Sequence, residues 1–244
     1  MNEIYKDKLQ TLRQRIPIGL QNGLALLEKA EGNLDEAEKQ FQNEMVLLTI
    51  SKTEVTTEVA IRHLVKSNFD IGLTIKSIDE ERYTLTEVIL RKYKDKKEEA
   101  LDKTMYAIEK RHNLNRKYWL SFDELNILPS EIYCLLTTME WLNYESCESY
   151  GNALSFNLDI VTEQLENKLG LAHLANSLRQ ANDIQTIIYA QNETNKDFQN
   201  YIKAREELQN NKEYRKYEKD FISQRPILID KLYELVKSNI DKFP

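Results

Sequence analysis

The side chains that most often carry out chemistry in proteins are few and widely spaced in this sequence. Its histidines, His63, His112 and His173, lie in three different parts of the chain. No His-Glu-x-x-His motif and no pair of Glu-x-x-His motifs surrounds them, although such spacing is what brings metal ligands to one helix face. We therefore interpret the histidines as surface or core residues and expect no metal site.

The two cysteines, Cys134 and Cys147, are too far apart for a Cys-x-x-Cys motif. Neither has a second cysteine or a histidine cluster near it in the sequence. The alternatives are a disulfide, a metal site, or a pair of reduced thiols that are partly buried. We favour reduced thiols, because nothing around them is typical of a redox or metal motif.

Nucleophile, phosphate and acid-base motifs are absent as well. The sequence contains no Gly-x-Gly-x-x-Gly, Walker-type or Gly-x-Ser-x-Gly motif, and its 6 glycines are too sparse to form a phosphate-binding loop. Carboxylate pairs such as Glu98 with Glu99 and Glu145 with Glu148 lie among ordinary charged neighbours on expected helices. We expect no catalytic residue, no cofactor and no enzyme activity; the alternative is an active site assembled from distant helices.

The composition favours an all-α protein. Only 6 glycines and 4 prolines interrupt long stretches rich in Leu, Glu, Lys, Gln and Ala, which lose little side-chain freedom in a helix. No run approaches the roughly 18 apolar residues that cross a bilayer, and "MNEIYKDKLQ" lacks a signal-peptide core. We therefore expect a cytoplasmic protein without membrane contact, and the net charge of −6 disfavours direct nucleic-acid binding.

The first 48 residues are expected to form a three-helix module. Pro17 and Gly19 separate the helix "EIYKDKLQTLRQR" from "LQNGLALLEKA", in which Leu20, Leu24 and Leu27 share one face. Gly32 and Asn33 then end the second helix. Asn33 is also a suitable N-cap for the third helix, "LDEAEKQFQNEMVLL".

Residues 49–80 are expected to form a second module of the same kind. A shift of 37 positions places Leu27 on Leu64 and Phe41 on Ile78, and it replaces the Asn33 cap by Asp70. The preceding element, "TEVTTEVAIRHLVKS", has Thr53 as a possible N-cap. A repeat of this length favours tandem copies of one small helical unit.

Both segments resemble known families. The stretch "LRQRIPIGLQNGLALLEKAEGNLDEA" resembles the N-terminal domain of elongation factor Ts, and "TEVTTEVAIRHLVKSNFDIGLTIKSI" resembles the ubiquitin-associated (UBA) domain of the nascent-polypeptide-associated complex. The resemblance implies a UBA-like three-helix fold and a protein-binding surface formed by the first interhelical loop and the third helix. The candidate partner-binding residues are Ile16, Pro17, Ile18, Gly19, Leu20 and Phe41. The alternative is that these residues pack the two modules together.

Residues 81–193 are expected to form a larger α-helical domain with opposite charge in its two parts. Residues 80–117 support one long helix or two stacked ones and hold eleven Lys and Arg against eight Asp and Glu. Residues 120–193 hold eleven acidic side chains against only Lys168 and Arg179. This acidic part is either neutralised within the chain, for example by Lys92, Lys96, Lys97 and Lys103, or kept for a basic partner.

Two further segments complete the expected domain plan. Pro129 opens a helix in "LPSEIYCLLTTMEWLNYE", and the order of "NYESCESYGNALS" before "GLAHLANSLRQA" resembles the acidic DMP19-like bacterial family, which includes a DNA mimic. Residues 194–244 are expected to form a C-terminal segment with one polar helix, a break at Pro226 and then the amphipathic helix "ILIDKLYELVKSNI". That last helix either docks on the preceding helices or is presented to a partner.

Together these observations predict a non-catalytic adaptor that binds another protein, whose identity the residues do not reveal. The alternative is an acidic inhibitor or DNA-mimic-type protein that occupies a basic site on a regulator, nuclease or toxin.

Overall fold

The chain is all-α, as its composition predicts. The computed structural model describes residues 5–244, which form helices and no strand. The chain divides into two compact units, Met1–Tyr83 and Thr84–Pro244, referred to below as the N-terminal and C-terminal units. Within the described residues, no helix is both long enough and apolar enough to span a bilayer.

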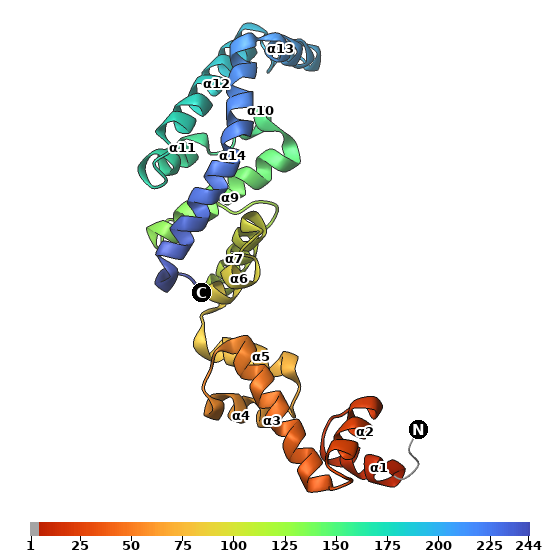
Figure 1. The fold of residues 1–244 in the computed structure, drawn as a ribbon. Helices are drawn as coiled ribbons and strands as arrows, with labels where there is room; N and C mark the ends of the chain where they lie inside the picture. Colours follow the sequence, from red (N-terminus) through yellow and green to blue (C-terminus); the bar gives the residue numbers. More distant parts are fainter. Residues whose placement is uncertain (1–4) are drawn as a thin grey trace. The chain divides into compact units, whose positions relative to one another are not determined.

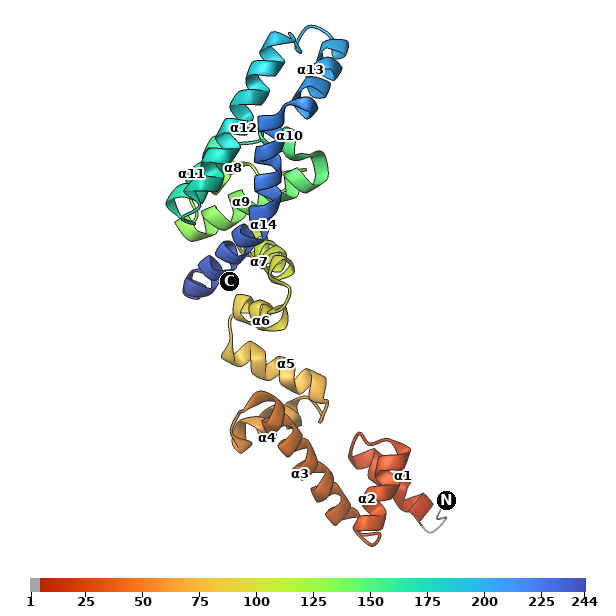
Figure 2. The ribbon, with the colours of Figure 1, turned by 45° about the horizontal axis from the view of Figure 1, so that its top comes forward.

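The N-terminal unit is built around one long helix. Figures 1 and 2 show α3 with α1 and α2 against its first half and α4 and α5 against its second half. The helices of this unit are α1 (Lys6–Arg15), α2 (Leu20–Lys29), α3 (Leu34–Thr53), α4 (Thr57–Lys66) and α5 (Ile71–Arg82). Because α3 is continuous, the expected module boundary between residues 48 and 49 lies inside a helix.

The turns after α2 and α4 have the same backbone geometry, 37 positions apart. Gly32 N–H donates to the carbonyl of Leu27, and Phe69 N–H donates to that of Leu64. This six-to-one hydrogen bond is typical of a helix that ends in a left-handed turn. Gly32 and Phe69 both have positive φ, +78° and +60°, a conformation that glycine adopts freely and phenylalanine rarely does.

The N-caps after these turns are as predicted. The Asn33 side chain accepts from the backbone N–H groups of Asp35 and Glu36, and Asp70 accepts from that of Leu73. The prediction for Thr53 is wrong, because Thr53 is the last residue of α3. Thr56, three positions later, caps α4 instead, after Glu54 ends α3 in a left-handed conformation.

Two small hydrophobic clusters stabilise the N-terminal unit. The first contains Leu12, Leu27 and Phe41, and the second contains Val55, Ala60 and Ile78. Of the three leucines expected on one face of α2, Leu27 is fully buried, whereas Leu20 is 59% exposed. Leu20 is the first residue of the helix, and the buried residues of α2 are Gly23, Leu26 and Leu27.

The C-terminal unit has a single hydrophobic core to which every long helix contributes. The basic region forms two helices rather than one, separated by residues 93–96. Figure 1 shows α12 and α14 side by side, with α9 crossing beneath α14. The elements are α6 (Leu85–Lys92), α7 (Lys97–His112), α8 (Phe122–Leu125), α9 (Ser130–Glu148), α10 (Tyr150–Ala153), α11 (Leu158–Asn167), α12 (Ala172–Gln191), α13 (Phe198–Asn210), α14 (Lys212–Ser238) and a 3-10 turn at Ile240–Lys242.

The predicted break at Pro226 is wrong. Pro226 lies inside α14, and the chain breaks earlier, at Asn211. The Asn211 side chain accepts from the N–H groups of Glu213 and Tyr214 and so starts a new helix. Proline removes one hydrogen bond from a helix and its ring crowds the carbonyl four residues earlier, but burial of Phe221 and Leu228 on either side holds α14 together across this position.

The C-terminal end of the chain packs on its own unit. The buried face of α14 includes Leu232 and Val236. The carbonyl oxygen of Pro244 accepts from the N–H of Thr86, and Lys242 forms an ion pair with Glu131 at 2.7 Å. Of the two alternatives for the last helix, docking on the preceding helices is therefore correct.

Candidate functional site

A groove crosses the N-terminal unit. It lies between α2, α3 and the loop that joins α1 to α2. It has a volume of about 340 Å³. Its floor is apolar and includes Ile18, Leu26 and Phe41, which are buried, and the partly exposed Met45 and Phe69. The remaining lining residues are Pro17, Gly19, Asn22, Ala25, Lys29 and Glu44. An apolar floor with a polar rim is the usual composition of a protein-binding pocket.

The structure brings four of the six candidate partner-binding residues to this groove: Pro17, Ile18, Gly19 and Phe41. The other two do not line it. Ile16 is buried in the first hydrophobic cluster, and Leu20 is exposed outside the groove. Ile18 and Phe41 belong to the same cluster, so they form the floor of the groove and the core at once.

Phe69 contributes a part of the groove floor, and the sequence did not suggest this residue. Its ring lies 5.7 Å from that of Phe41, centroid to centroid, at an angle of 54°. Because Phe69 has a positive φ, the backbone holds it in a conformation that costs on the order of 1 kcal/mol. A shift of 37 positions matches Phe69 with Gly32, and this departure from glycine was the signal that could have identified it.

Opposite charges face each other at the rim. Lys29 of α2 and Glu44 of α3 lie 3.8 Å apart, and both side chains are more than half exposed. An exposed pair of this kind contributes little to stability. It does offer a cation and an anion to polar groups of a bound chain, next to the apolar floor.

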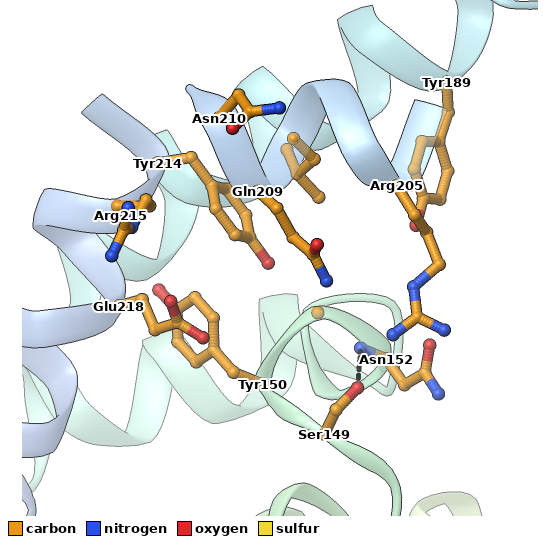
Figure 3. Close-up of a pocket in the computed structure, with 12 residues that line it drawn as sticks. Ser149, Tyr150, Asn152, Tyr189, Arg205, Gln209, Asn210, Tyr214, Arg215 and Glu218 are labelled. Carbon is orange, nitrogen blue, oxygen red and sulfur yellow. Dashed lines mark hydrogen bonds between the residues drawn. The ribbon is translucent and has the colours of Figure 1, made fainter. Parts of the chain in front are cut away.

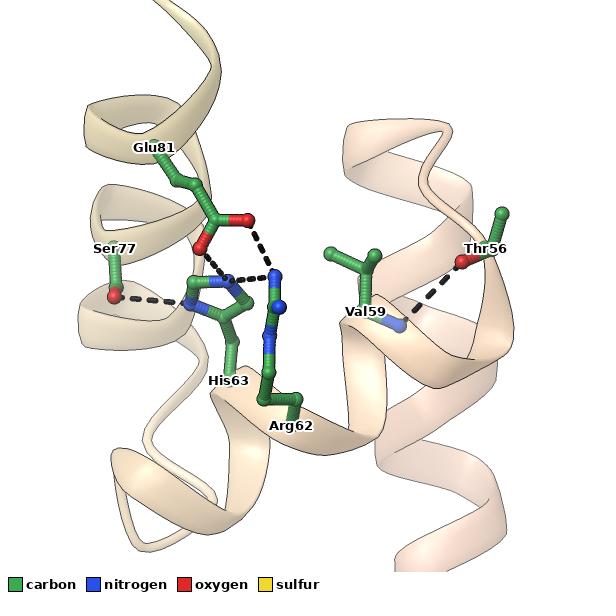
Figure 4. A network of polar contacts seen from close by, with 6 residues as sticks. All are labelled: Thr56, Val59, Arg62, His63, Ser77 and Glu81. Carbon is green, nitrogen blue, oxygen red and sulfur yellow. Dashed lines mark hydrogen bonds and ion pairs between the residues drawn. The ribbon is translucent and has the colours of Figure 1, made fainter.

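The N-terminal unit also contains a serine, a histidine and a carboxylate in contact. Figure 4 shows His63 of α4 between Ser77 and Glu81 of α5. The ring nitrogen Nδ1 lies 3.0 Å from Ser77 Oγ, and Nε2 lies 3.2 Å from Glu81 Oε2; Arg62 pairs with the same carboxylate. Ser77 lies in the middle of a helix, where backbone N–H groups already bond within the helix and cannot stabilise an oxyanion. We interpret the cluster as a structural link between α4 and α5.

A second cavity lies in the C-terminal unit, where α10, α12, α13 and the start of α14 meet. Its volume is about 460 Å³. Figure 3 shows Arg205, Gln209 and Tyr214 extending toward Asn152 on the opposite wall. The other lining residues are Ser149, Tyr150, Gly151, Tyr189, Leu208, Asn210, Arg215 and Glu218. Residues that are separated by many positions in the sequence therefore share one polar cavity.

Two tyrosines of this cavity are almost fully buried. Burial raises the pKa of Tyr150 and of Tyr214, and nearby charges such as Glu218 raise both further. Both phenols therefore keep their protons at neutral pH and can donate hydrogen bonds. The hydroxyl of Tyr150 and the side-chain oxygen of Gln185, beside the cavity, have no hydrogen-bond partner among the described residues.

Some carboxylates of the acidic part form ion pairs within the chain, and others do not. Within residues 120–193, Glu140 pairs with Arg116, Glu131 with Lys242, Glu166 with Arg179, and Glu193 with Lys196. The four lysines considered for this role do not pair with it: Lys97 pairs with Asp230 and Lys96 with Glu99, and Lys92 and Lys103 form no ion pair within the described residues. Exposed acidic residues without an ion pair in the described chain are Asp123, Glu124, Glu148, Asp159, Glu163 and Asp183.

The two cysteines are unpaired in the structure. Cys134 is buried in α9, and burial raises the pKa of its thiol to about 12, so the thiol stays protonated and inert. Cys147 is exposed near the end of the same helix. Between residues 5 and 244 no three His, Cys, Asp or Glu side chains lie close enough together to hold a metal ion.

Comparison with known proteins gives a family for most of the chain. Residues 84–241 match the family model described as "YfbN C-terminal domain". The chain is also 36% identical over 174 residues to the protein of Escherichia coli strain K12 named "Uncharacterized protein YfbN". That alignment covers 71% of this chain and 72% of the relative. The chain belongs to the YfbN family. No solved structure matches it.

The YfbN family match covers one of the two candidate sites and not the other. The matched domain begins at residue 84, where the C-terminal unit also begins, and Thr84 starts α6 with a capping box. The polar cavity therefore lies inside the YfbN C-terminal domain, whereas the apolar groove lies in the unit that precedes it. The name of the YfbN relative describes no activity.

Proposed function

We propose that this YfbN-family chain is a non-catalytic adaptor whose N-terminal unit, a tandem pair of UBA-like modules, binds another protein through the groove between α2 and α3. The observation that carries this proposal is the position of Phe69. The backbone holds its ring in a rarely adopted conformation beside Phe41, where it completes an apolar groove that stays partly exposed. Strained residues persist where the surrounding structure requires them, often at binding sites.

The groove fits an apolar side chain from a partner. Its volume is large enough for one or two such side chains, and its floor is already formed by buried residues of the core. The charged pair of Lys29 and Glu44 at the rim would orient the polar backbone or side chains that flank the inserted group. A partner segment with one or two apolar anchors and mixed charge beside them is therefore the expected ligand.

Substitution of Ala25 by aspartate tests this proposal. Ala25 lines the groove but is exposed, so the change places a charge in the binding surface without disturbing the core. Because the partner would have to bury that charge unpaired, we expect binding to weaken by at least about tenfold. The measurement is affinity capture with the full chain from an extract of the native cells, followed by quantitative mass spectrometry.

The matched control is Gln21→Asp, one helical turn earlier on α2 and outside the groove. It introduces the same charge on an exposed position of the same helix, and we expect captured proteins to be unchanged. Equal loss of the main partner in both variants, or equal retention in both, would rule out the groove as the binding surface.

A second candidate function is supported by the unpaired acidic residues on α8, α9, α11 and α12. An acidic inhibitor that occupies a basic site needs exposed carboxylates that are not neutralised within the chain. In that case capture of the main partner should fall steeply between about 50 and 300 mM salt, because exposed charges are screened. Capture that resists salt but fails with Ala25→Asp would exclude the inhibitor function in favour of the adaptor.

A further inference from the structure

The cavity of the C-terminal unit has the size of a small-molecule site. Its volume of about 460 Å³ falls within the range of ordinary ligand pockets. It opens where α10, a helix of one turn, faces α13 and the start of α14 (Figure 3). At Gly151 an added Cβ would lie 3.0 Å from the Tyr214 hydroxyl, so any side chain at this position would crowd the floor of the cavity.

The charges in the cavity are not satisfied within the protein. Arg205, Arg215 and Glu218 line it, and none of their side chains forms an ion pair or hydrogen bond among residues 5–244. By contrast, Arg116 and Arg225 of the same unit both form ion pairs with carboxylates. With two arginines and one glutamate in its lining, the cavity has a net charge of +1.

The polar groups around this charge can all donate hydrogen bonds. Tyr214 has a protonated hydroxyl, and Gln209 and Asn152 have amide groups that can donate or accept. In Figure 3 the guanidinium of Arg205 reaches across the cavity to lie beside Asn152, and Gln209 and Tyr214 extend into the cavity from α13 and α14. A guanidinium with neighbouring donors is the arrangement that binds a carboxylate with two parallel hydrogen bonds.

We infer that the cavity binds a small polar carboxylate, with its carboxylate group on Arg205 and its hydroxyl or amide groups between Gln209, Tyr214 and Asn152. A monovalent anion matches the net charge of the cavity. A phosphate dianion fits it less well, because Glu218 would repel the second charge. Leu208 and the tyrosine rings provide an apolar surface that can contact the carbon skeleton of such a ligand.

The inference can be tested by titrating the full, 15N-labelled chain with L-lactate, D-glycerate and 4-hydroxybenzoate. The arginine Nε and glutamine amide resonances report the cavity directly. Each carboxylate is compared with its neutral carboxamide, and inorganic phosphate serves as the other anion. We expect saturable shifts at Arg205 and Gln209 with at least one carboxylate, with a Kd of about 1 mM or below, and none with its carboxamide.

Two variants make the assignment specific. Arg205→Gln removes the exposed guanidinium and should weaken carboxylate binding about tenfold or more. Lys203→Gln removes a positive charge from the same helix outside the cavity and should leave the Kd within about twofold.

Four results would overturn the inference. They are no saturable shift with any of the carboxylates, equal binding of a carboxamide, tighter binding of phosphate, or an equal effect of the two variants. Because the cavity and the groove lie in different units, failure here leaves the proposed adaptor function untouched, and loss of partner capture leaves this inference untouched.

Discussion

Replacement of Arg116 by leucine is expected to lower the free energy of unfolding of the C-terminal unit by about 3 kcal/mol at pH 8. Arg116 binds Glu109 through two nitrogens and also pairs with Glu140, whose side chain is 0% exposed. Without the arginine, Glu140 would remain as a buried carboxylate with only the N–H of Leu120 as a donor. Chemical denaturation followed by tryptophan fluorescence measures the loss.

This loss should depend on pH in a defined direction. Burial raises the pKa of Glu140 above its usual range, and loss of Arg116 removes an attraction that lowers it. A carboxyl whose pKa is higher in the folded state binds its proton more tightly there, so the folded state loses stability as pH rises through that pKa. The difference between the variant and the wild type should therefore be smaller at pH 5 than at pH 8.

Two further variants check the cause. In the Arg116→Leu background, Glu140→Gln removes the unpaired charge and should recover part of the stability at pH 8 while abolishing the pH dependence. Arg179→Leu breaks a partly exposed ion pair with Glu166 and should cost less than about 1 kcal/mol. A pH-independent loss in Arg116→Leu would show that lost packing, rather than the buried carboxylate, is responsible.

Phe41→Ala is expected to destabilise the N-terminal unit by about 3 to 4 kcal/mol while leaving the C-terminal unit unchanged. Phe41 is 6% exposed and is packed in the first hydrophobic cluster with Leu12 and Leu27. A unit of this size typically has only about 4 to 12 kcal/mol of stability, so the loss is a large part of the total. Hydrogen exchange of the full chain, followed by mass spectrometry, measures each unit separately.

The control for this prediction is Leu47→Ala on the same helix. Leu47 is 68% exposed, and its truncation should change the stability by less than about 0.5 kcal/mol. Phe41 is also one of the candidate partner-binding residues. If Phe41→Ala leaves hydrogen exchange in α1 to α3 unchanged but abolishes partner capture, then Phe41 acts as a contact residue and its assignment to the core is wrong.

The fold could be predicted where local interactions decide it. Asn33 and Asp70 cap helices because their side chains reach backbone N–H groups two or three residues away, and this geometry depends only on nearby residues. The prediction failed at Pro226, because packing on both sides outweighs the one hydrogen bond that proline removes. It also missed Asn211, whose capping role was hidden within a continuous polar stretch.

The candidate sites were predicted less completely. The loop between α1 and α2 was expected to contribute to a binding surface, and Pro17, Ile18 and Gly19 do line the groove. Phe69 was missed because its residue type does not suggest a positive φ, and only its match with Gly32, 37 positions earlier, indicates one. The cavity was missed altogether, since Tyr150, Arg205 and Tyr214 belong to three different helices.

By itself the sequence determined the all-α class, the left-handed turn at Gly32 and the caps that follow both turns. These features depend on backbone preferences and on contacts between near neighbours. Only the tertiary structure decided that Phe69 faces Phe41 and that Arg205 shares a cavity with Tyr214. Such contacts join distant parts of the chain, and they form only when burial of the apolar faces brings the helices together.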